Sequence, residues 1–248
     1  MAENIGKFPF VVEPFSEDFA GRLSWGFLGN HLLRCASLHA GSLGFGFDDM
    51  QQSQHVWVLS RLVVDIAQMP CTGEEYTIET WVSKIYRQFT DRLYAITGKD
   101  GKIFGHAHSI WALISMDTRQ PLDLASLPNN GFSNAVCERE VPIKGPGRVR
   151  VKSENAVRTQ TAQYSDLDIN GHVNSIRYIA MILDVFGKEL YNERKVVKRV
   201  EMSYCAESYH GDTLSFFVDE PDAATRQVEV RKSNGEVVVK AIVVFGDI

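Results

Sequence analysis

Hydrophobic and polar positions follow two similar series along the 248-residue chain. Each series starts with an apolar, helix-like segment and continues with four strand-like runs. The helix-like segments cover residues 29–46 and 171–187, and the strand-like runs cover 56–64, 76–82, 91–97 and 103–114, then 196–202, 213–218, 227–231 and 237–245. An Asp-Gly or Asn-Gly pair, typical of tight β-hairpins, separates the last two runs of each series. The pattern predicts two copies of a unit with one helix and an antiparallel sheet.

The spacing between equivalent positions supports a duplication. Gly29 and Gly171, at the starts of the two helix-like segments, lie 142 positions apart, and Gly73 and Gly211 lie 138 apart. The two hairpin pairs lie 134 positions apart. A slow drift of this kind is expected for two copies of one unit that have lost a few loop residues.

Proline and glycine gather between the two series. Over residues 117–152 the strand pattern is lost, and the composition is typical of a linker. We therefore expect an N-terminal unit over residues 1–125, a linker over 126–150 and a C-terminal unit over 151–248. The predicted fold class is α+β, with two tandem hotdog units, each a central helix wrapped by an antiparallel sheet, joined as a pseudo-dimer.

The composition narrows the class of protein. Hydrophobic residues make up 44% and charged residues 23% of the chain, as in an ordinary globular protein, and a net charge of -5 argues against a general nucleic-acid binder. There is no signal-peptide pattern and no run of about 18 apolar residues, so we expect a cytoplasmic protein without a membrane span. The four cysteines form no C-x-x-C pair. No cofactor and no metal ion is expected.

Polar residues cluster where the second helix-like segment starts. The sequence from Tyr164 to Asn174 contains Asp168, Asn170 and His172. One interpretation is helix capping, because acidic and amide side chains favour a helix N-terminus. The other is catalysis, in which Asn170 and His172 converge on a thioester carbonyl and the helix N-terminus stabilises a developing oxyanion.

A general base for this chemistry must come from elsewhere in the chain. Glu207 stands in a run of mainly apolar and neutral residues, although it could instead be a solvated loop carboxylate. Counting back 138 positions places Met69 at the equivalent point of the first half, which also lacks an Asp-x-Asn-x-His sequence. We therefore expect one active site per chain.

The residues Asp166 to Ser175, followed by Tyr178 and Ile179, resemble a motif of the acyl-acyl carrier protein (acyl-ACP) thioesterases. These plant and bacterial enzymes release fatty acids from a carrier protein. The resemblance covers both halves at the level of the strand pattern. It implies hydrolysis of fatty acyl-ACP thioesters, with an acyl-ACP as partner and an acyl-chain pocket shaped by the first half.

The resemblance also implies roles for individual residues. Asp168, Asn170 and His172 match the family's catalytic Asp-x-Asn-x-His, and Glu207 matches a catalytic Glu that follows a Tyr-x-x spacing. The family's next residue is Cys, and this chain has Ser208 there, so a thiol mechanism is not expected. Glu207 would activate water, Asn170 and His172 would bind or polarise the carbonyl, and Asp168 would support the site.

Other readings of the sequence stay open. An acyl-CoA thioesterase has the same scaffold, and a non-catalytic hotdog protein could bind acyl chains without cleaving them. Pairing into a homodimer is also left open. Two basic runs, 144–152 and 194–199, could steer an acidic carrier protein toward the enzyme.

Overall fold

The computed structural model describes residues 4–126, 135–191 and 195–247. It divides into two compact units. Unit 1 consists of Met1–Ser60 and Met69–Lys144, and unit 2 consists of Arg61–Gln68 and Gly145–Ile248. The short segment Arg61–Gln68 thus belongs to the second unit although it lies early in the chain.

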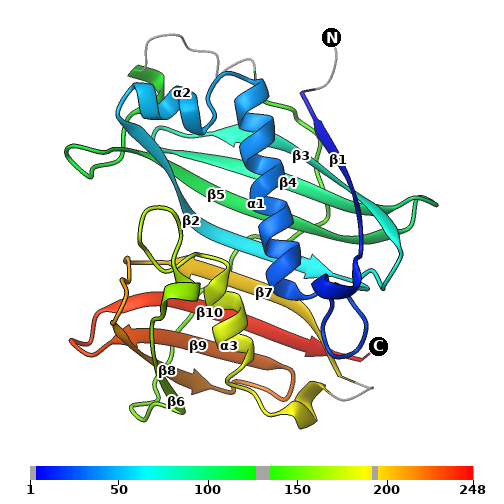
Figure 1. Ribbon diagram of the computed structural model, residues 1–248, viewed down its shortest axis with the longest axis vertical. Coiled ribbons are helices and arrows are strands. Elements are labelled where there is room, and N and C mark those ends of the chain that lie inside the picture. Colours follow the sequence, from blue (N-terminus) through cyan, green and yellow to red (C-terminus); the bar gives the residue numbers. More distant parts are fainter. Residues whose placement is uncertain (1–3, 127–134, 192–194, 248) are drawn as a thin grey trace. The chain divides into compact units, whose positions relative to one another are not determined.

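In unit 1 one long helix packs on an antiparallel sheet (Figure 1). The elements are β1 (Gly6–Val11), α1 (Trp25–Ser42), α2 (Phe47–Gln52), β2 (His55–Ile66, which continues into unit 2), β3 (Glu75–Ile85), β4 (Phe89–Gly98) and β5 (Ile103–Ser115). The strands β1, β3, β4 and β5 are neighbours in that order. The buried face of α1 carries Leu28, Leu32, Cys35, Ala36 and His39, at the three- and four-residue spacing of one helix face.

Unit 2 repeats this plan with a shorter helix (Figure 1). Its elements are β6 (Arg158–Thr161), α3 (Arg177–Leu183), β7 (Val196–Tyr204), β8 (Thr213–Asp219), β9 (Thr225–Lys232) and β10 (Val237–Gly246). The strand order is β7, β10, β9, β8, β6, all antiparallel, and Arg61–Asp65 of β2 pairs with β7. Buried side chains of α3, Tyr178, Ile179, Met181 and Ile182, cover the sheet.

The structure confirms the predicted fold class, since each unit has a main helix, α1 or α3, against an antiparallel sheet in the hotdog arrangement. All eight strand-like runs are strands, and both Gly pairs lie in hairpins between consecutive strands. Within 135–150, the described part of the expected linker, there is no regular helix or strand. The assignment of domains to residues 1–125 and 151–248 stays a prediction.

The predicted helix bounds were wrong in both halves. In unit 1 the helix starts earlier, at Trp25, because Ser24 caps it by accepting a hydrogen bond from the Phe27 amide at 3.4 Å. In unit 2 the residues from Gly171 to Ile176 form a turn, and the regular helix has only seven residues. Among the described strands and α-helices, β1, β6 and α2 were not predicted.

Candidate active site

The candidate site is built on a turn that precedes α3. One carboxylate oxygen of Asp168, Oδ1, accepts hydrogen bonds from the backbone amides of Asn170 (2.8 Å) and His172 (3.2 Å). The amide of Asp168 donates in return to the carbonyl of His172 at 2.8 Å. Gly171 has a φ of 77°, which suits glycine far better than other residues. Asp168 therefore fixes the backbone from which Asn170 and His172 project.

The carboxylate of Asp166 links this turn to the neighbouring backbone and to α3. Asp166 is buried, and its Oδ2 accepts from the amide of Gln163 at 2.9 Å. Its Oδ1 accepts from Nε (3.1 Å) and Nη2 (2.8 Å) of Arg177, the first residue of α3. Because Asp166 bonds both Gln163 and Arg177, it joins the start of the turn segment to the helix. Capping chemistry and candidate catalytic residues thus occur in the same segment.

Glu207 lies beside His172. The distance from His172 Nε2 to Glu207 Oε2 is 3.6 Å. The backbone accounts for this proximity, because His172 forms a β-bridge with Tyr209 and the Val173 amide donates to the carbonyl of Ser208 at 2.8 Å. The pairing brings two segments that are 35 residues apart in sequence into contact.

Sequence reasoning missed one residue of this group, Tyr209. Its hydroxyl donates to Glu207 Oε2 at 2.9 Å, and its ring packs edge-on against His172 with centroids 5.1 Å apart. Tyr209 thus contacts both candidate catalytic groups. The sequence did contain a signal for this contact. Tyr209 follows Glu207 by two positions, and alternate residues of an extended segment share a face.

The four predicted residues are not all in mutual contact. Asp168, Asn170 and His172 share the turn, and Glu207 contacts only His172 among them. Asn170 is exposed, and among the described residues its side chain makes no hydrogen bond. Its amide group is therefore available to a ligand at the rim of the turn.

Unit 1 contains the same turn without these side chains. Oδ1 of Asp18 accepts from the amides of Ala20 (2.8 Å) and Arg22 (3.2 Å), and Gly21 has a φ of 69°. The amide of Asp18 donates to the carbonyl of Arg22 at 2.7 Å. These contacts repeat those of Asp168, 150 positions later in the chain. The counterparts of Asn170 and His172 are therefore Ala20 and Arg22.

This equivalence corrects the predicted offset of 142 at the helix start. Asn30 and His31 lie inside α1, where His31 Nδ1 is hydrogen-bonded to the hydroxyl of Tyr76 at 2.6 Å. The counterpart of Glu207 agrees with the count of 138. The Leu23 amide donates to the carbonyl of Pro70 as the Val173 amide donates to that of Ser208. Pro70 is therefore equivalent to Ser208, and the residue before it, Met69, is equivalent to Glu207.

Two residues near Glu207, Cys205 and Ser208, are the candidates for a thiol or hydroxyl nucleophile. Cys205 is exposed, and partial desolvation raises the pKa of its thiol, which lowers the thiolate fraction. Ser208 is 1% exposed, so its hydroxyl has little access to a substrate. Neither residue has the surroundings of an activated nucleophile.

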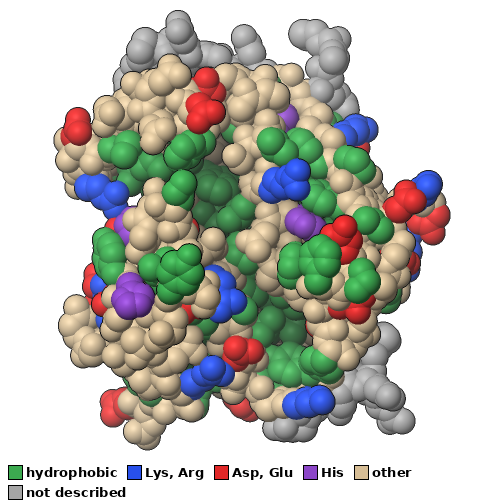
Figure 2. Space-filling model, viewed as in Figure 1, with side chains coloured by type: hydrophobic (Ala, Val, Ile, Leu, Met, Phe, Trp, Pro, Cys, Tyr) green, Lys and Arg blue, Asp and Glu red, His purple; other side chains and the backbone are tan. Residues whose placement is uncertain are grey.

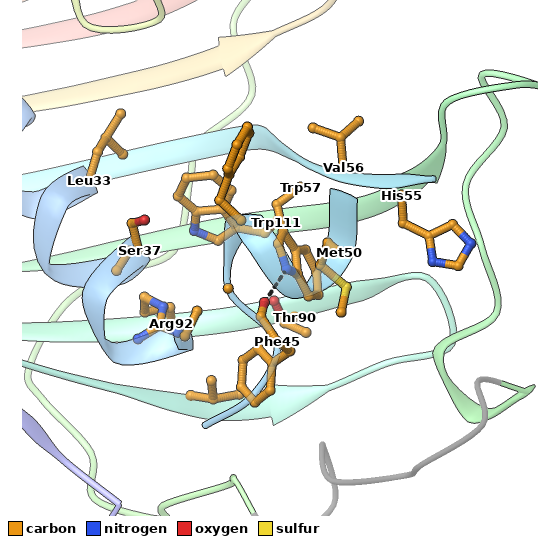
Figure 3. Close-up of a pocket in the computed structure, with 15 residues that line it drawn as sticks. Leu33, Ser37, Phe45, Met50, His55, Val56, Trp57, Thr90, Arg92 and Trp111 are labelled. Carbon is orange, nitrogen blue, oxygen red and sulfur yellow. Dashed lines mark hydrogen bonds between the residues drawn. The ribbon is translucent and has the colours of Figure 1, made fainter. Parts of the chain in front are cut away.

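A pocket of about 170 Å³ lies in unit 1 between α1, α2 and the sheet (Figure 3). Most of its wall is apolar and aromatic, including Leu33, Phe45, Met50, Trp57 and Trp111. Trp57 is held in place by a hydrogen bond from its indole N–H to the carbonyl of Phe45 at 2.9 Å. A space of this composition suits an apolar ligand.

The basic run at 194–199 is largely neutralised. Lys195 pairs with Asp247 (3.1 Å), Arg199 pairs with Asp65 and Glu201 (3.0 and 2.7 Å), and Lys198 donates to the carbonyl of Ala67 (2.8 Å). Arg194 lies outside the described residues. On the face shown in Figure 2, basic side chains are scattered among acidic ones. Within the described ranges, no helix is long and apolar enough to cross a membrane.

Comparison with known proteins places the chain among thioesterases. The model of the acyl-ACP thioesterase N-terminal domain matches residues 7–126, and that of the C-terminal domain matches residues 150–246. A crystal structure of an acyl-ACP thioesterase from Bacteroides thetaiotaomicron is 49% identical, with a TM-score of 0.93 and coverage of 98% of both chains. The 12:0-ACP thioesterase from Umbellularia californica, at 19% identity, shares the fold, with a TM-score of 0.86 over 100% of this chain and 99% of that one.

Curated plant relatives are longer. The chloroplastic palmitoyl-acyl carrier protein thioesterase of Gossypium hirsutum is 28% identical over 63% of this chain and 41% of its own length. The chain therefore spans about two fifths of that relative. Because both domain models match in order, and a solved relative is 49% identical over almost the whole chain, the chain belongs to the acyl-ACP thioesterase family.

Proposed function

We propose that the chain hydrolyses fatty acyl-ACP thioesters to free fatty acid and carrier protein. The observation that carries this proposal is the contact between His172 and Glu207 beside the turn held by Asp168, in a chain of this family. The fold alone would not carry it, because one fold can support many activities. A carboxylate that can act as a base, beside donors that can bind a carbonyl oxygen, is a combination able to hydrolyse a thioester.

In the proposed mechanism Glu207 is the general base. It takes a proton from water, whose oxygen attacks the thioester carbonyl carbon, and the C–S bond breaks when the tetrahedral intermediate collapses. The departing thiolate takes up the proton held by Glu207 and becomes the carrier's thiol, and this restores the carboxylate. The hydroxyl of Tyr209 holds the Glu207 carboxylate in position through its hydrogen bond.

The carbonyl oxygen would be bound by the turn. We assign this role to the side chains of Asn170 and His172, whose donors would stabilise the negative charge that develops on the oxygen. Asp168 positions both residues through the two amides that it accepts from. A distance of 3.6 Å between His172 and Glu207 is compatible with tightening when substrate binds.

Unit 1 would serve the acyl chain rather than the chemistry. It has Ala20 and Arg22 in its turn and Met69 in the neighbouring segment, in place of Asn170, His172 and Glu207, so it lacks the proposed carbonyl-binding and base groups. Its apolar pocket supports a role in holding the fatty chain. We accordingly propose one active site per chain, in the C-terminal domain.

A thiol-release assay tests the function. Purified protein is given acyl-ACP and acyl-CoA substrates of matched chains, from medium to long, saturated and unsaturated. We expect turnover on acyl-ACP with a higher kcat/KM than on acyl-CoA. Preferential release from acyl-CoA would favour the alternative thioesterase, and binding without turnover on any thioester would favour an acyl-binding protein.

Some expectations need other measurements. A cytoplasmic location remains a prediction, and the plant relatives are named chloroplastic. The homodimer likewise remains open to a sedimentation measurement. Docking of an acidic carrier on the basic run at 144–152 is a further prediction, supported by the exposure of Lys144, Arg148 and Arg150.

A further inference from the structure

A buried arginine lines the pocket in unit 1. Arg92, on β4, lines the pocket and is only 4% exposed. Figure 3 shows Arg92 and Ser37 at one end of the pocket and His55 at the other. Around the pocket Val82 and Thr90 are buried like Arg92, whereas Ser37 and Phe47 are exposed.

In the part of the chain that the structure describes, protein groups accept hydrogen bonds from only one of the three guanidinium nitrogens of Arg92, Nη1. Nη1 is 2.8 Å from His39 Nδ1 and donates to Thr80 Oγ1 at 3.3 Å. Over the described residues, Nε and Nη2 have no acceptor, and no carboxylate pairs with Arg92. Arginine is almost never fully buried unless it is paired, because removing its charge from water is unfavourable. Burial accordingly lowers the pKa of Arg92.

The neighbouring histidine does not supply a negative charge. Burial, and next the Arg92 charge, lower the pKa of His39 to about 4, so this ring is neutral near pH 7. Its Nδ1 then accepts from Arg92, and the remaining N–H groups of the guanidinium stay available to a ligand in the pocket. An all-methylene chain cannot accept these hydrogen bonds.

We propose that the pocket binds acyl chains that carry an oxygen at their far end, a hydroxyl or a carboxylate, which accepts from Arg92. This inference deepens the proposed function, on which it rests, by naming the substrate class. A carboxylate would also neutralise the buried charge in the bidentate geometry that guanidinium favours. A hydroxyl would accept one of the free N–H groups.

The test compares acyl-ACPs of equal length that end in a methyl, a hydroxyl or a carboxylate group. The wild type should hydrolyse at least one oxygen-ended chain with a kcat/KM about tenfold to a hundredfold higher than the methyl-ended chain, the usual effect of a hydrogen bond to a charged group. The hydroxyl and carboxylate arms show which oxygen is preferred. Equal rates for all three chain ends would overturn the proposal.

Variants separate recognition from structural support. Arg92→Met should abolish the preference, and Arg92→Lys should retain part of it. Arg87→Met, which removes an exposed arginine paired with Asp123, is the matched control and should keep the preference. If Arg92→Met accepts longer methyl-ended chains while the wild type prefers no polar end, Arg92 limits chain length and the proposal fails.

A binding measurement covers the case in which Arg92→Met does not fold. Calorimetry on the wild-type chain compares free fatty acids with their ω-hydroxy and ω-carboxy forms, and tighter binding of an oxygen-ended form is expected. Equal affinity for the three kinds of fatty acid would overturn the inference, and this measurement does not depend on turnover. Absence of thiol release from every acyl-ACP would instead contradict the proposed function, so the two failures are distinguishable.

Discussion

Two carboxylates at the candidate site have different surroundings, and these surroundings suggest different duties. Oδ1 of Asp168 already accepts from two backbone amides. Two side chains approach Oε2 of Glu207, those of His172 and of Tyr209, whose hydroxyl donates to it. The first carboxylate is suited to holding the backbone, and the second is suited to moving a proton.

Substitution of the proposed general base, Glu207, or of the proposed carbonyl-binding residue, His172, should remove most of the activity. Glu207→Gln and His172→Ala should each lower kcat by ~10²-fold or more, the usual scale for a positioned acid–base group. Steady-state thiol release on acyl-ACP measures the effect, with circular dichroism to check folding. Cys205→Ala serves as the control and should be mild. A folded but inactive Cys205→Ala enzyme would revive a thiol mechanism.

At the scale of the element, the central feature is the turn that occurs in both units. Its hydrogen bonds run from backbone amides to an aspartate, so the same structure forms with Ala20 and Arg22 as with Asn170 and His172. The turn therefore does not depend on the candidate catalytic side chains. Stability and activity should respond differently to substitutions in the two copies.

Paired substitutions test this separation. Asp18→Ala and Asp168→Ala should each lower the free energy of unfolding by roughly 1–3 kcal/mol, because each leaves two turn amides without their acceptor. Only Asp168→Ala should also lower kcat, since only that turn carries His172. Urea denaturation and thiol release measure the two effects. Equal losses of activity in both variants would contradict the assignment of one site per chain.

The sequence predicted some elements better than others, for physical reasons. Long strands with regular alternation, such as 103–114 within β5, were located well. The strands β1 and β6 were missed because they are short edge strands, and β1 contains Pro9, which disfavours a strand assignment. The equivalence of Asp18 and Asp168 was missed because the turns share only Asp and a Gly three residues later, a short pattern at an offset of 150 rather than 142.

The candidate site was likewise only partly predictable. The motif identified Asp168, Asn170 and His172, and the repeat supported Glu207 through Met69. The contact of Glu207 with His172 depends on the β-bridge at Tyr209, which no local pattern specifies. The roles of these residues stay predictions until variants are measured.

At the scale of the whole molecule, stability depends on charged and titratable groups that folding buries. In unit 1, His39 is 4% exposed and faces Arg92 from β4. In unit 2, the buried Glu229 pairs with Arg231 (2.5 Å) and Lys240 (2.8 Å), and these partners lower its pKa against the opposing effect of burial. Such groups link the folding of each unit to pH.

As the pH falls, the altered pKa of His39 should reduce the free energy of unfolding at a higher pH than protonation of the paired carboxylates does. Folding lowers the His39 pKa from an ordinary value of about 6.5 to about 4, so between these values the unfolded chain binds a proton that the folded chain does not. Stability therefore falls as pH decreases through this window, by about 2 kcal/mol from pH 7 to pH 5. The Glu229 contribution is lost only at lower pH.

Urea denaturation of wild type and His39→Gln at both pH values measures this contribution. The pKa of His31 is also lowered by burial, so the wild type alone does not isolate His39. The variant should lose about 2 kcal/mol less than the wild type over the same interval. An identical pH dependence in the two proteins would show that His39 is not the group responsible.

The shared turn also has a consequence for how the two units can differ. Both units have the backbone-holding aspartate, Asp18 and Asp168, and only the second has Asn170, His172 and Glu207 around it. Unit 1 has a helix of 18 residues where unit 2 has seven, and a pocket lies beside the longer helix. On the proposed division of roles, substitutions around this pocket would change substrate preference and leave the candidate hydrolytic residues of unit 2 as they are.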